Sequence, residues 1–244
     1  SIKRLLEKKF TNEVFFDKKL LNYSWFNTGG SADIFFKPKN IEQLSSFLKD
    51  IKKDFKEINI IGACSNTLIR DGGIEGVTIK LSSNFSFTKL VGNNIIEAGA
   101  GTFDRKVSDF ATLNKISGLE FLSCIPGTIG GAIRMNSGCY GTEICNILRS
   151  IKVMDFEGSI KELRNNEIKF NYRNCDLPRN LDNKKEIKIR GDNIKKHKAA
   201  TFRWGKVKDR FNIPNENEHA PHHFKLSPTK KKSTIVPILK LPTK

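Results

Sequence analysis

Apolar and polar positions along residues 27–81 predict strands and helices in turn. ADIFFKP at 32–38 has the short apolar run of a strand, and its proline ends that strand. IEQLSSFLKDIKK at 41–53 repeats its apolar residues every three or four positions, which predicts a helix. INIIGACSN at 58–66 and VTIKL at 77–81 are expected to be further strands, and the first of them leads into a turn that contains glycine.

The same alternation continues through residues 93–163. NNIIEAGAG at 93–101 predicts a strand that ends in glycines, and SIKVMDFEGSIKEL at 150–163 predicts a hairpin with its turn at 157–158. TFDRKVSDFATLNKI at 102–116 has the spacing of a helix between them. We expect four apolar side chains of that helix to face inward: Phe103, Val107, Phe110 and Leu113.

This pattern ends near Pro178. The residues that follow are polar and basic without a helical period, and five prolines stand at positions 214, 221, 228, 237 and 242. Because proline lacks a backbone N–H, we expect neither a regular helix nor a central strand there. We interpret residues 181–244 as an extended segment.

Composition narrows the class of protein. A hydrophobic fraction of 38% and 18 phenylalanines in 244 residues indicate a globular chain, and no apolar run reaches the 18 residues of a membrane-spanning helix. Five cysteines without a CxxC pair favour a reducing compartment, either the bacterial cytoplasm or an organelle matrix such as that of a mitochondrion. The chain does not begin with Met, which raises the question of a removed targeting segment, but we interpret SIKRLLEKKF at 1–10 as an amphipathic first helix.

The charge is unusually high, +17 from 43 basic and 26 acidic side chains. Residues 181–244 hold 17 basic and 6 acidic residues, a net charge of +11, so the extended segment carries most of the excess. An AT-rich genome, which favours Lys, Asn, Ile and Phe, would account for part of it.

Four motifs follow one another along the chain: NTGG at 27–30, GACSN at 62–66, IPGTIGG at 125–131 and NNEIKFNYR at 165–173. The first three follow predicted strands, where glycine lets the backbone approach an anion or a flat ring closely. The last contains a predicted strand, EIKFNYR. In this order the motifs resemble the family of UDP-N-acetylenolpyruvoylglucosamine reductases (MurB), over roughly residues 23–178.

The resemblance implies an α+β, two-lobed FAD-binding fold of the vanillyl-alcohol-oxidase/PCMH type. We divide the chain accordingly into an N-terminal lobe (1–84), a second lobe (85–180) and a basic, proline-rich extension (181–244) in place of the substrate-binding domain.

The resemblance also implies the chemistry and its residues. Family members pass a hydride from NADPH to FAD and then to the enol ether carbon of the substrate. The residues that correspond to FAD contacts are Gly62, Ser65, Asn66, Gly127, Thr128, Gly130 and Gly131. The family's catalytic Tyr-Arg pair corresponds to Tyr172 and Arg173, whose guanidinium would stabilise the enolate-like intermediate.

Several positions depart from the family pattern. The serine that donates a proton and the glutamate near the C-terminus have no counterpart after Arg173. Cys64 replaces a glycine of the diphosphate turn, and Cys124, Arg134 and Cys139 also stand where smaller or less polar residues are usual. A Cβ and sulfur at a point of close approach would cost about 1–3 kcal/mol, so we expect FAD to bind weakly or not at all.

Two functions follow from these observations. The first hypothesis is a degenerate, non-catalytic member of the family, used as a structural and RNA-binding component of a ribonucleoprotein. Its RNA contacts would be cations interleaved with an aromatic residue: Lys195, Lys196, Arg203, Trp204, Lys206, Lys208, Arg210, Lys230, Lys231 and Lys232. The alternative is an FAD-dependent reductase of peptidoglycan precursor synthesis, truncated or divergent at its C-terminus, and the sequence leaves open whether the chain is an enzyme.

A metal site is the third class considered. HAPHH places His219, His222 and His223 at an irregular spacing around a proline, with no cysteine nearby, so we assign no metal.

Overall fold

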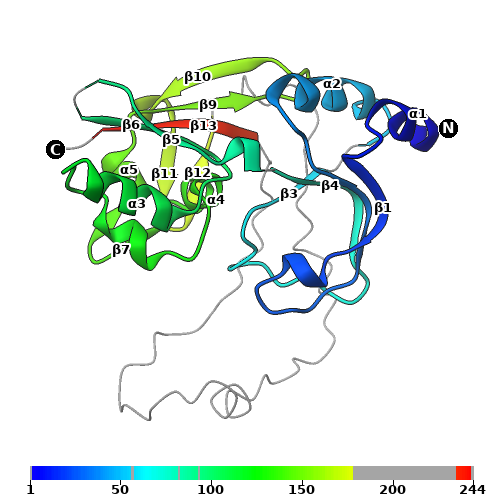
Figure 1. The fold of residues 1–244 in the computed structure, drawn as a ribbon, viewed down its shortest axis with the longest axis horizontal. Coiled ribbons are helices and arrows are strands. Elements are labelled where there is room, and N and C mark those ends of the chain that lie inside the picture. Colours follow the sequence, from blue (N-terminus) through cyan, green and yellow to red (C-terminus); the bar gives the residue numbers. More distant parts are fainter. Residues whose placement is uncertain (1, 56–57, 82, 93, 178–234, 243–244) are drawn as a thin grey trace, which may run out of the picture.

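The computed structural model describes residues 2–55, 58–81, 83–92, 94–177 and 235–242 (Figure 1). Two sheets lie side by side, each with its own helices. The sheets differ in the direction of their strands, since the first is mixed and the second is antiparallel throughout. This arrangement confirms the predicted α+β class, while the exact boundaries of the three predicted segments stay a prediction.

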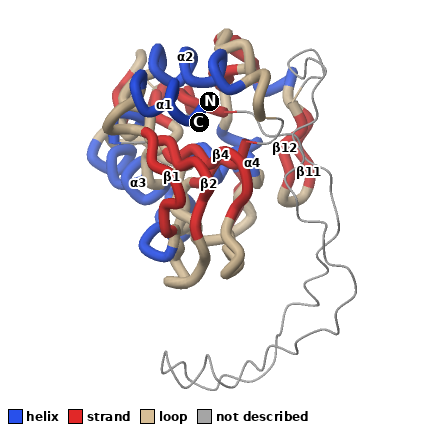
Figure 2. Tube along the Cα trace, turned by 90° about the vertical axis from the view of Figure 1, so that its right-hand side faces the viewer, coloured by secondary structure: helices blue, strands red, loops and turns tan. Residues whose placement is uncertain are grey.

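The first sheet consists, in spatial order, of β1 (Val14–Lys19), β2 (Ser31–Phe36), β4 (Ile74–Lys80) and β3 (Ile58–Ile61). β1 is antiparallel to β2, whereas β2, β4 and β3 run parallel. The predicted first helix is confirmed as α1 (Ile2–Lys9), and a second helix, α2 (Ile41–Ile51), packs on the same lobe. Figure 2 shows both helices above the strands β1, β2 and β4.

Helix α2 shows why this lobe folds as it does. The side chain of Asn40 caps the helix by accepting a hydrogen bond from the backbone N–H of Gln43 at 2.8 Å. The apolar spacing noted in the sequence places Phe47 inside, where its ring stacks on that of Phe36 with 3.7 Å between centroids. The other buried side chains of the helix are Leu44, Leu48 and Ile51.

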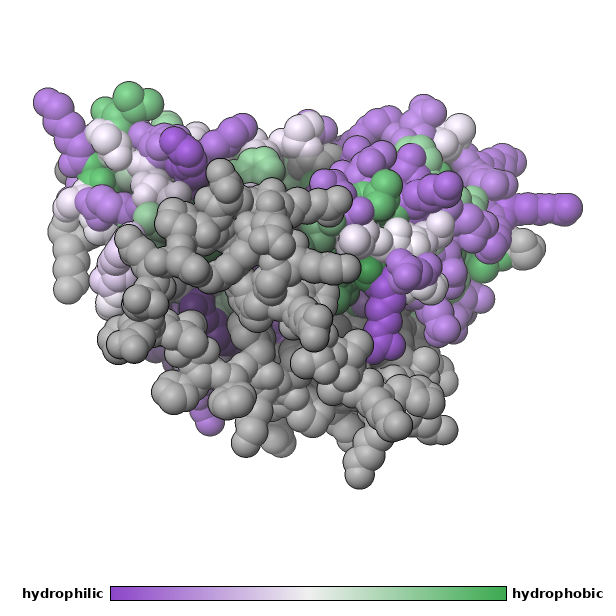
Figure 3. All heavy atoms as spheres, turned by 90° about the horizontal axis from the view of Figure 1, so that it is seen from below, coloured by the Kyte–Doolittle hydropathy of each residue, from purple (hydrophilic) through white to green (hydrophobic). Residues whose placement is uncertain are grey.

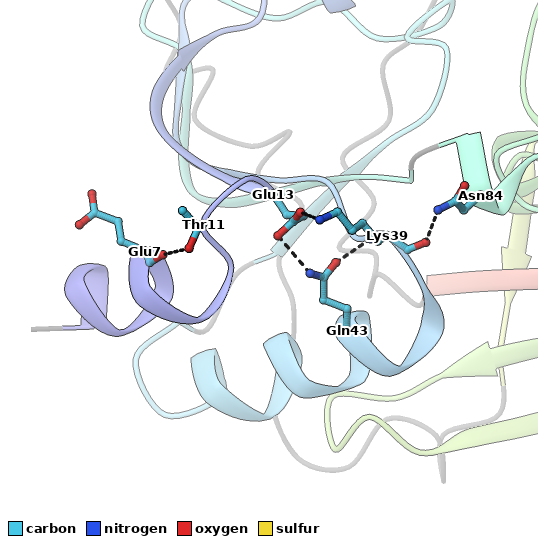
Figure 4. Close-up of polar contacts among 6 residues, drawn as sticks. All are labelled: Glu7, Thr11, Glu13, Lys39, Gln43 and Asn84. Carbon is cyan, nitrogen blue, oxygen red and sulfur yellow. Dashed lines mark hydrogen bonds and ion pairs between the residues drawn. The ribbon is translucent and has the colours of Figure 1, made fainter.

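A buried carboxylate joins the segment before β1 to the start of α2 (Figure 4). Glu13, which immediately precedes β1, forms an ion pair with Lys39 and accepts a hydrogen bond from Gln43 Nε2 at 3.1 Å. Asn84, in the short helix η2 (Ser83–Phe85), donates to the carbonyl of Lys39 at 2.7 Å. Because η2 leads into the second lobe, this contact helps to set where the second lobe begins.

The second sheet consists, in spatial order, of β10 (Ile160–Arg164), β9 (Ser150–Met154), β13 (Ile235–Pro242), β6 (Ile95–Gly99) and β5 (Thr88–Leu90). β9 and β10 confirm the predicted hairpin, with Gly158 at a φ of 72° in its turn. The predicted strand at 167–173 is shorter than expected. It is β11 (Lys169–Asn171), paired with β12 (Asn174–Asp176) through a two-residue turn.

The expectation that prolines keep the last residues out of a central strand is wrong. β13 contains two prolines, yet it pairs with β6 on one side and β9 on the other. Its register on β9 shifts between Ile235 and Ile238, around Pro237, so the missing donor falls at an irregularity of the ladder. Without β13, β6 and β9 would have no partner between them.

The helices of the second lobe are α3 (Asp104–Leu113), η3 (Glu120–Cys124), α4 (Ile129–Arg134) and α5 (Ile144–Ile147), with a small hairpin of β7 (Gly138–Cys139) and β8 (Thr142–Glu143). The predicted inward face of α3 is partly wrong. Val107 is buried and Phe110 packs against the core partly buried, as predicted, but Phe103 and Leu113 are 49% and 82% exposed. The buried residues of the helix are Asp104, Val107, Ser108 and Ala111. In the described ranges, no helix has the length and apolar character needed to cross a bilayer.

The two lobes are joined through α2 and the turn between β9 and β10. Ser45 Oγ in α2 donates to the carbonyl of Gly158 at 2.9 Å, and Lys52 pairs with Glu157. Met154, at the end of β9, is buried in the core of the first lobe. This shared packing fixes the relative position of the lobes, and so the shape of the space between them.

Candidate cofactor-binding site

A cavity of about 420 Å³ lies between the two lobes. One wall comes from the end of β3, the turn that follows it and the end of β4. The other comes from the turn after β6, the start of α3 and the helix α4, which Figure 1 shows on the side of the second lobe nearest β3 and β4. The lining residues are Ile60, Ile61, Gly62, Ala63, Lys80, Leu81, Ser83, Ser86, Ala100, Gly101, Phe103, Lys106, Thr128, Gly130, Gly131, Arg134 and Met135.

The two walls come very close at Gly62. A Cβ on this residue would lie 2.5 Å from Thr128 Oγ1, closer than side-chain atoms approach one another in proteins. Gly130 also packs tightly, since its Cβ would lie 3.1 Å from the carbonyl oxygen of Ala100. Gly62 therefore serves the approach of one lobe to the other, whereas Gly130 serves the packing of α4 on the turn after β6 within the second lobe.

Backbone hydrogen bonds hold the IPGTIGG loop against the turn that follows β6. Gly130 N donates to the carbonyl of Ala100 and Ile129 N to that of Thr102, both at 2.9 Å. Asp104 N donates to the carbonyl of Gly127 at 3.1 Å, and Phe103 forms an isolated β-bridge with Thr128. These contacts join residues 100–104 to residues 127–130 in the second wall.

Three cations and three hydroxyls face this cavity. The cations are Lys80, Lys106 and Arg134, and the hydroxyls belong to Ser83, Ser86 and Thr128. No acidic side chain lines it within the described part of the chain. Such a set of donors suits an anionic ligand.

Lys80 is held in place beside the turn that follows β3. Its Nζ donates to the carbonyl of Gly62 at 2.6 Å and lies 5.9 Å from the centre of the Tyr23 ring. Burial lowers the pKa of Lys80, and the charge of Lys37 acts in the same direction, against an opposing effect of Cys64. An anion in the cavity would favour the charged form of this side chain.

The structure brings together only part of the predicted site. Of the residues predicted to contact FAD, Gly62, Thr128, Gly130 and Gly131 line the cavity. Three others lie elsewhere: Ser65 and Asn66 are further along the turn, and Gly127 lies against Asp104. The sequence analysis did not identify four other lining residues, because no glycine motif marks them: Lys80, Lys106, Ser83 and Ser86. Lys80 does stand at the end of a predicted strand.

The effect expected of Cys64 differs from what the geometry shows. Its backbone has a φ of 54°, a left-handed conformation that favours glycine. Its side chain, however, is buried in the core of the first lobe with Phe35 and Ile69, and it is absent from the cavity lining. Burial raises the pKa of this thiol despite the nearby charge of Lys80. The sulfur therefore does not obstruct the cavity.

Tyr172 and Arg173 form the exposed turn between β11 and β12 and do not line the cavity. Tyr172 is 84% exposed, and the Arg173 guanidinium lies 5.6 Å from the centre of its ring. Two hydrogen bonds fasten this hairpin to the end of α4: Arg134 donates to the carbonyl of Cys175, and Asn136 Nδ2 donates to that of Asn171 at 3.3 Å. Because Arg134 also lines the cavity, the turn is tied to the cavity wall.

The fold and this glycine-lined, basic cavity define a flavoprotein-type domain, and the comparisons agree. The family model described as "FAD binding domain" matches residues 32–164, more than half of the chain, so the chain belongs to that family. Its relatives are more specific. The chain is 44% identical over 178 residues to UDP-N-acetylenolpyruvoylglucosamine reductase of Pelagibacter ubique, covering 71% of this chain and 59% of that protein.

A second relative is similar to the chain to about the same degree. The reductase of the same name from Rickettsia canadensis is 46% identical over 165 residues, covering 68% of this chain and 55% of the relative. The chain therefore spans somewhat more than half the length of the curated relatives it matches. The predicted resemblance to the FAD-binding part of this family is confirmed.

Solved structures confirm the fold class. The structure of UDP-N-acetylenolpyruvylglucosamine reductase (MurB) from Thermus caldophilus matches with a TM-score of 0.57 and 28% identity, over 69% of this chain and 57% of that one. A variant of berberine bridge enzyme matches with a TM-score of 0.52 at 15% identity, over 66% and 36% of the two chains. The latter likeness concerns the fold alone.

These relatives overturn the first functional hypothesis. The interpretation as a non-catalytic, RNA-binding component of a ribonucleoprotein is wrong, because the relatives at 44% and 46% identity are named as reductases. The basic charge that suggested an RNA partner was a poor guide, since composition does not identify a ligand without a site. The residues assigned to RNA (Lys195, Lys196, Arg203, Trp204, Lys206, Lys208, Arg210, Lys230, Lys231 and Lys232) lie outside the described residues.

The histidines weighed as metal ligands, His219, His222 and His223, also lie outside the described residues. Within the described ranges, no group of three or more His, Cys, Asp or Glu side chains is placed to hold a metal ion.

Proposed function

We propose that the cavity between the lobes binds FAD, and that this chain is the FAD-binding part of a UDP-N-acetylenolpyruvoylglucosamine reductase. The observation that carries the proposal is the cavity itself, on a chain whose residues 32–164 match an FAD binding domain. Its described lining has close-packed glycines and three cations, and no carboxylate among those residues. A dianionic diphosphate suits this set of donors.

The polar lining residues would contact the diphosphate of the cofactor. Lys80, Lys106 and Arg134 would neutralise the diphosphate, and the hydroxyls of Ser83, Ser86 and Thr128 would donate hydrogen bonds to it. Ser65 and Asn66 would reach its outer side from the turn that follows Gly62. The close contact of Gly62 with Thr128 would keep the two lobes at the spacing that encloses the cofactor.

Bound FAD would carry the hydride from NADPH to the enolpyruvyl carbon of the substrate. Arg173 and Tyr172 are proposed to meet that substrate from the exposed turn, where a guanidinium can bind a carboxylate and stabilise negative charge as it develops. The hydrogen bonds from Arg134 and Asn136 hold this turn beside the cavity wall. All five cysteines are free, which suits a reducing compartment, and we propose the bacterial cytoplasm.

Anaerobic mixing of the FAD-loaded chain with NADPH tests the proposal. The expected result is loss of the visible flavin absorbance, followed by its recovery when the enolpyruvyl substrate is added. Arg173→Gln should leave reduction by NADPH intact and slow the recovery. A chain that binds no FAD would contradict the cofactor assignment, and a chain that binds FAD but is never reduced would contradict the reductase.

A further inference from the structure

Asp104 is an acidic residue in an unusual position. It is the first residue of α3, and its exposed fraction is 0%. Among the residues that the structure describes, neither of its carboxyl oxygens has a hydrogen-bond partner. Buried polar atoms in native proteins are nearly always paired, and a buried ionised carboxylate without a partner is strongly unfavourable. A carboxyl group in this position is expected to be protonated in the folded protein.

Within the described part of the chain, no neighbouring charge alters the protonation expected of Asp104. Burial alone raises the pKa of Asp104 to about 8. The loop at 125–131 that lies over it contains no titratable side chain. None of the charged or titratable groups on the elements packed around Asp104 is among the causes of its pKa shift. These groups are Arg105, Lys106 and Asp109 on α3, Glu97 on β6, Glu120 and Cys124 on η3, Arg134 on α4, and Lys80 across the cavity.

The carboxyl lies directly under the cavity wall. A Cβ on Gly127 would be 2.6 Å from Asp104 Oδ2, so the backbone of this turn packs on the carboxyl without a side chain between them. The next residue, Thr128, lines the cavity and meets Gly62 of the other lobe. Asp104 N and Phe103 also bind the turn, through the carbonyl of Gly127 and the bridge to Thr128.

We propose that Asp104 is a positioning residue: the turn at 125–128 packs on its carboxyl only while that carboxyl is neutral, so that the cavity retains FAD only while Asp104 is protonated. This inference rests on the proposed binding of FAD. An ionised Asp104 would need water or a donor, which it can reach only if the turn over it moves. Thr128 would then leave its position against Gly62, and the wall of the cavity would open.

Thermodynamic linkage makes the proposal quantitative. If FAD binds only the form with a protonated Asp104, its dissociation constant should be constant between pH 6 and 7, about twofold weaker at pH 8 and about tenfold weaker at pH 9. Asp104→Asn keeps the shape of the side chain and cannot ionise, so its FAD affinity should stay constant over the same range. Asp109→Asn, an exposed position of the same helix, should behave as the wild type does.

The experiment is an FAD titration of the full chain, followed by flavin fluorescence, at pH 6–9 and constant ionic strength. A wild-type FAD affinity that does not change with pH would overturn the proposal. A pH dependence that is still present in Asp104→Asn would also overturn it, because the titrating group would then be Lys80. Absence of FAD binding in every variant at every pH would instead contradict the proposed function, and this inference with it.

The wild-type chain alone provides a second measurement, which is needed if Asp104→Asn does not fold. Binding of FAD at pH 8 should draw about half a proton per chain from a weakly buffered solution, because half of the free chains carry an ionised Asp104 at that pH. Uptake of no proton at pH 8 would overturn the proposal.

Discussion

Gly62 and Thr128 are the residues at which the two lobes touch across the cavity. The substitution Gly62→Ala should push Thr128 away, because the new Cβ would lie 2.5 Å from Thr128 Oγ1. We expect FAD affinity to fall about tenfold, or about 1.4 kcal/mol, in a fluorescence titration. This substitution tests the space available beside Gly62, and not the conformational freedom of its backbone.

A second substitution separates this clash from other effects. Thr128→Ala removes Oγ1, and the remaining Thr128 atoms are at ordinary distances from the added Cβ, so Gly62→Ala/Thr128→Ala should recover most of the lost affinity. Gly72→Ala is the matched control, since its Cβ would have no atom within 4 Å and the residue does not line the cavity. Equal losses in all three variants would show that the close approach at Gly62 has no special role.

The raised pKa of Asp104 also makes the stability of the folded protein depend on pH. Its pKa is about 8 in the folded protein and about 4 in the unfolded chain, so between these values only the unfolded chain releases the proton as pH rises. The free energy of unfolding should therefore fall by up to about 1.4 kcal/mol per pH unit from pH 4 to 8 and then level off. Urea unfolding of wild type and Asp104→Asn should show a gap, in favour of Asn, that widens over this range. A constant gap would contradict the burial of a protonated acid.

Sequence reasoning failed at this residue for a physical reason. Periodicity assigns apolar side chains to the inner face of a helix, and Asp104 breaks that rule at the start of α3. Cys64 shows the converse: the sequence correctly marked a position that suits glycine, but it could not show that the side chain points into the core.

Among the elements, those with strong periodicity could be predicted well. The helix at 41–53 and the hairpin at 150–163 are present as α2 and as β9 with β10, because their apolar spacing matches the face that they bury. β13 could not be predicted. Its place between β6 and β9 depends on pairing with residues more than 80 positions earlier in the chain, which no local pattern encodes.

β13 leads to a prediction about truncation. A chain that ends at residue 177 would leave β6 and β9 without a strand between them, so their backbone groups would lose the ladders that β13 supplies. We expect this chain to lose cooperative thermal unfolding in circular dichroism. A peptide of residues 235–242 added in trans should restore it at least in part.

The matched control removes only residues 243–244, which lie beyond β13. That chain should melt as the full chain does. If residues 1–177 alone unfold at the same temperature and as cooperatively as the full chain, the central position of β13 is contradicted.

At the scale of the whole molecule, net charge and local charge have to be distinguished. The chain carries +17, and Figure 3 shows hydrophilic residues over much of the described surface of both lobes, with smaller hydrophobic areas between them. A general attraction of anions would depend on the net charge, whereas the proposed site depends on the three cations that line the cavity.

Two lysine substitutions separate these effects. Lys80→Met and Lys161→Met change the net charge equally, but Lys80 lines the cavity and Lys161 is exposed on β10. We expect Lys80→Met to weaken FAD binding at least tenfold at moderate salt, which is about 1.4 kcal/mol, and Lys161→Met to change it less than twofold. Equal effects of the two substitutions would show that only the net charge matters.

For the molecule as a whole, the ordered motifs were a better guide than composition. Four motifs in one order identified the family and the fold, because an ordered set of motifs is far more specific than one glycine-rich turn. The charge of residues 181–244 led instead to an RNA partner that the relatives overturn. The cations of the cavity come from β4, α3 and α4, and only the folded chain brings them together.

Equilibrium dialysis of the full chain against FAD is the most direct test of the central claim, that the space between the lobes is a cofactor site. The account predicts one FAD per chain, with micromolar or tighter affinity at pH 7, and clear competition by ADP, which shares the diphosphate, but none by riboflavin at the same concentration. A chain that binds no FAD at pH 7, or binds riboflavin as tightly as FAD, would contradict it.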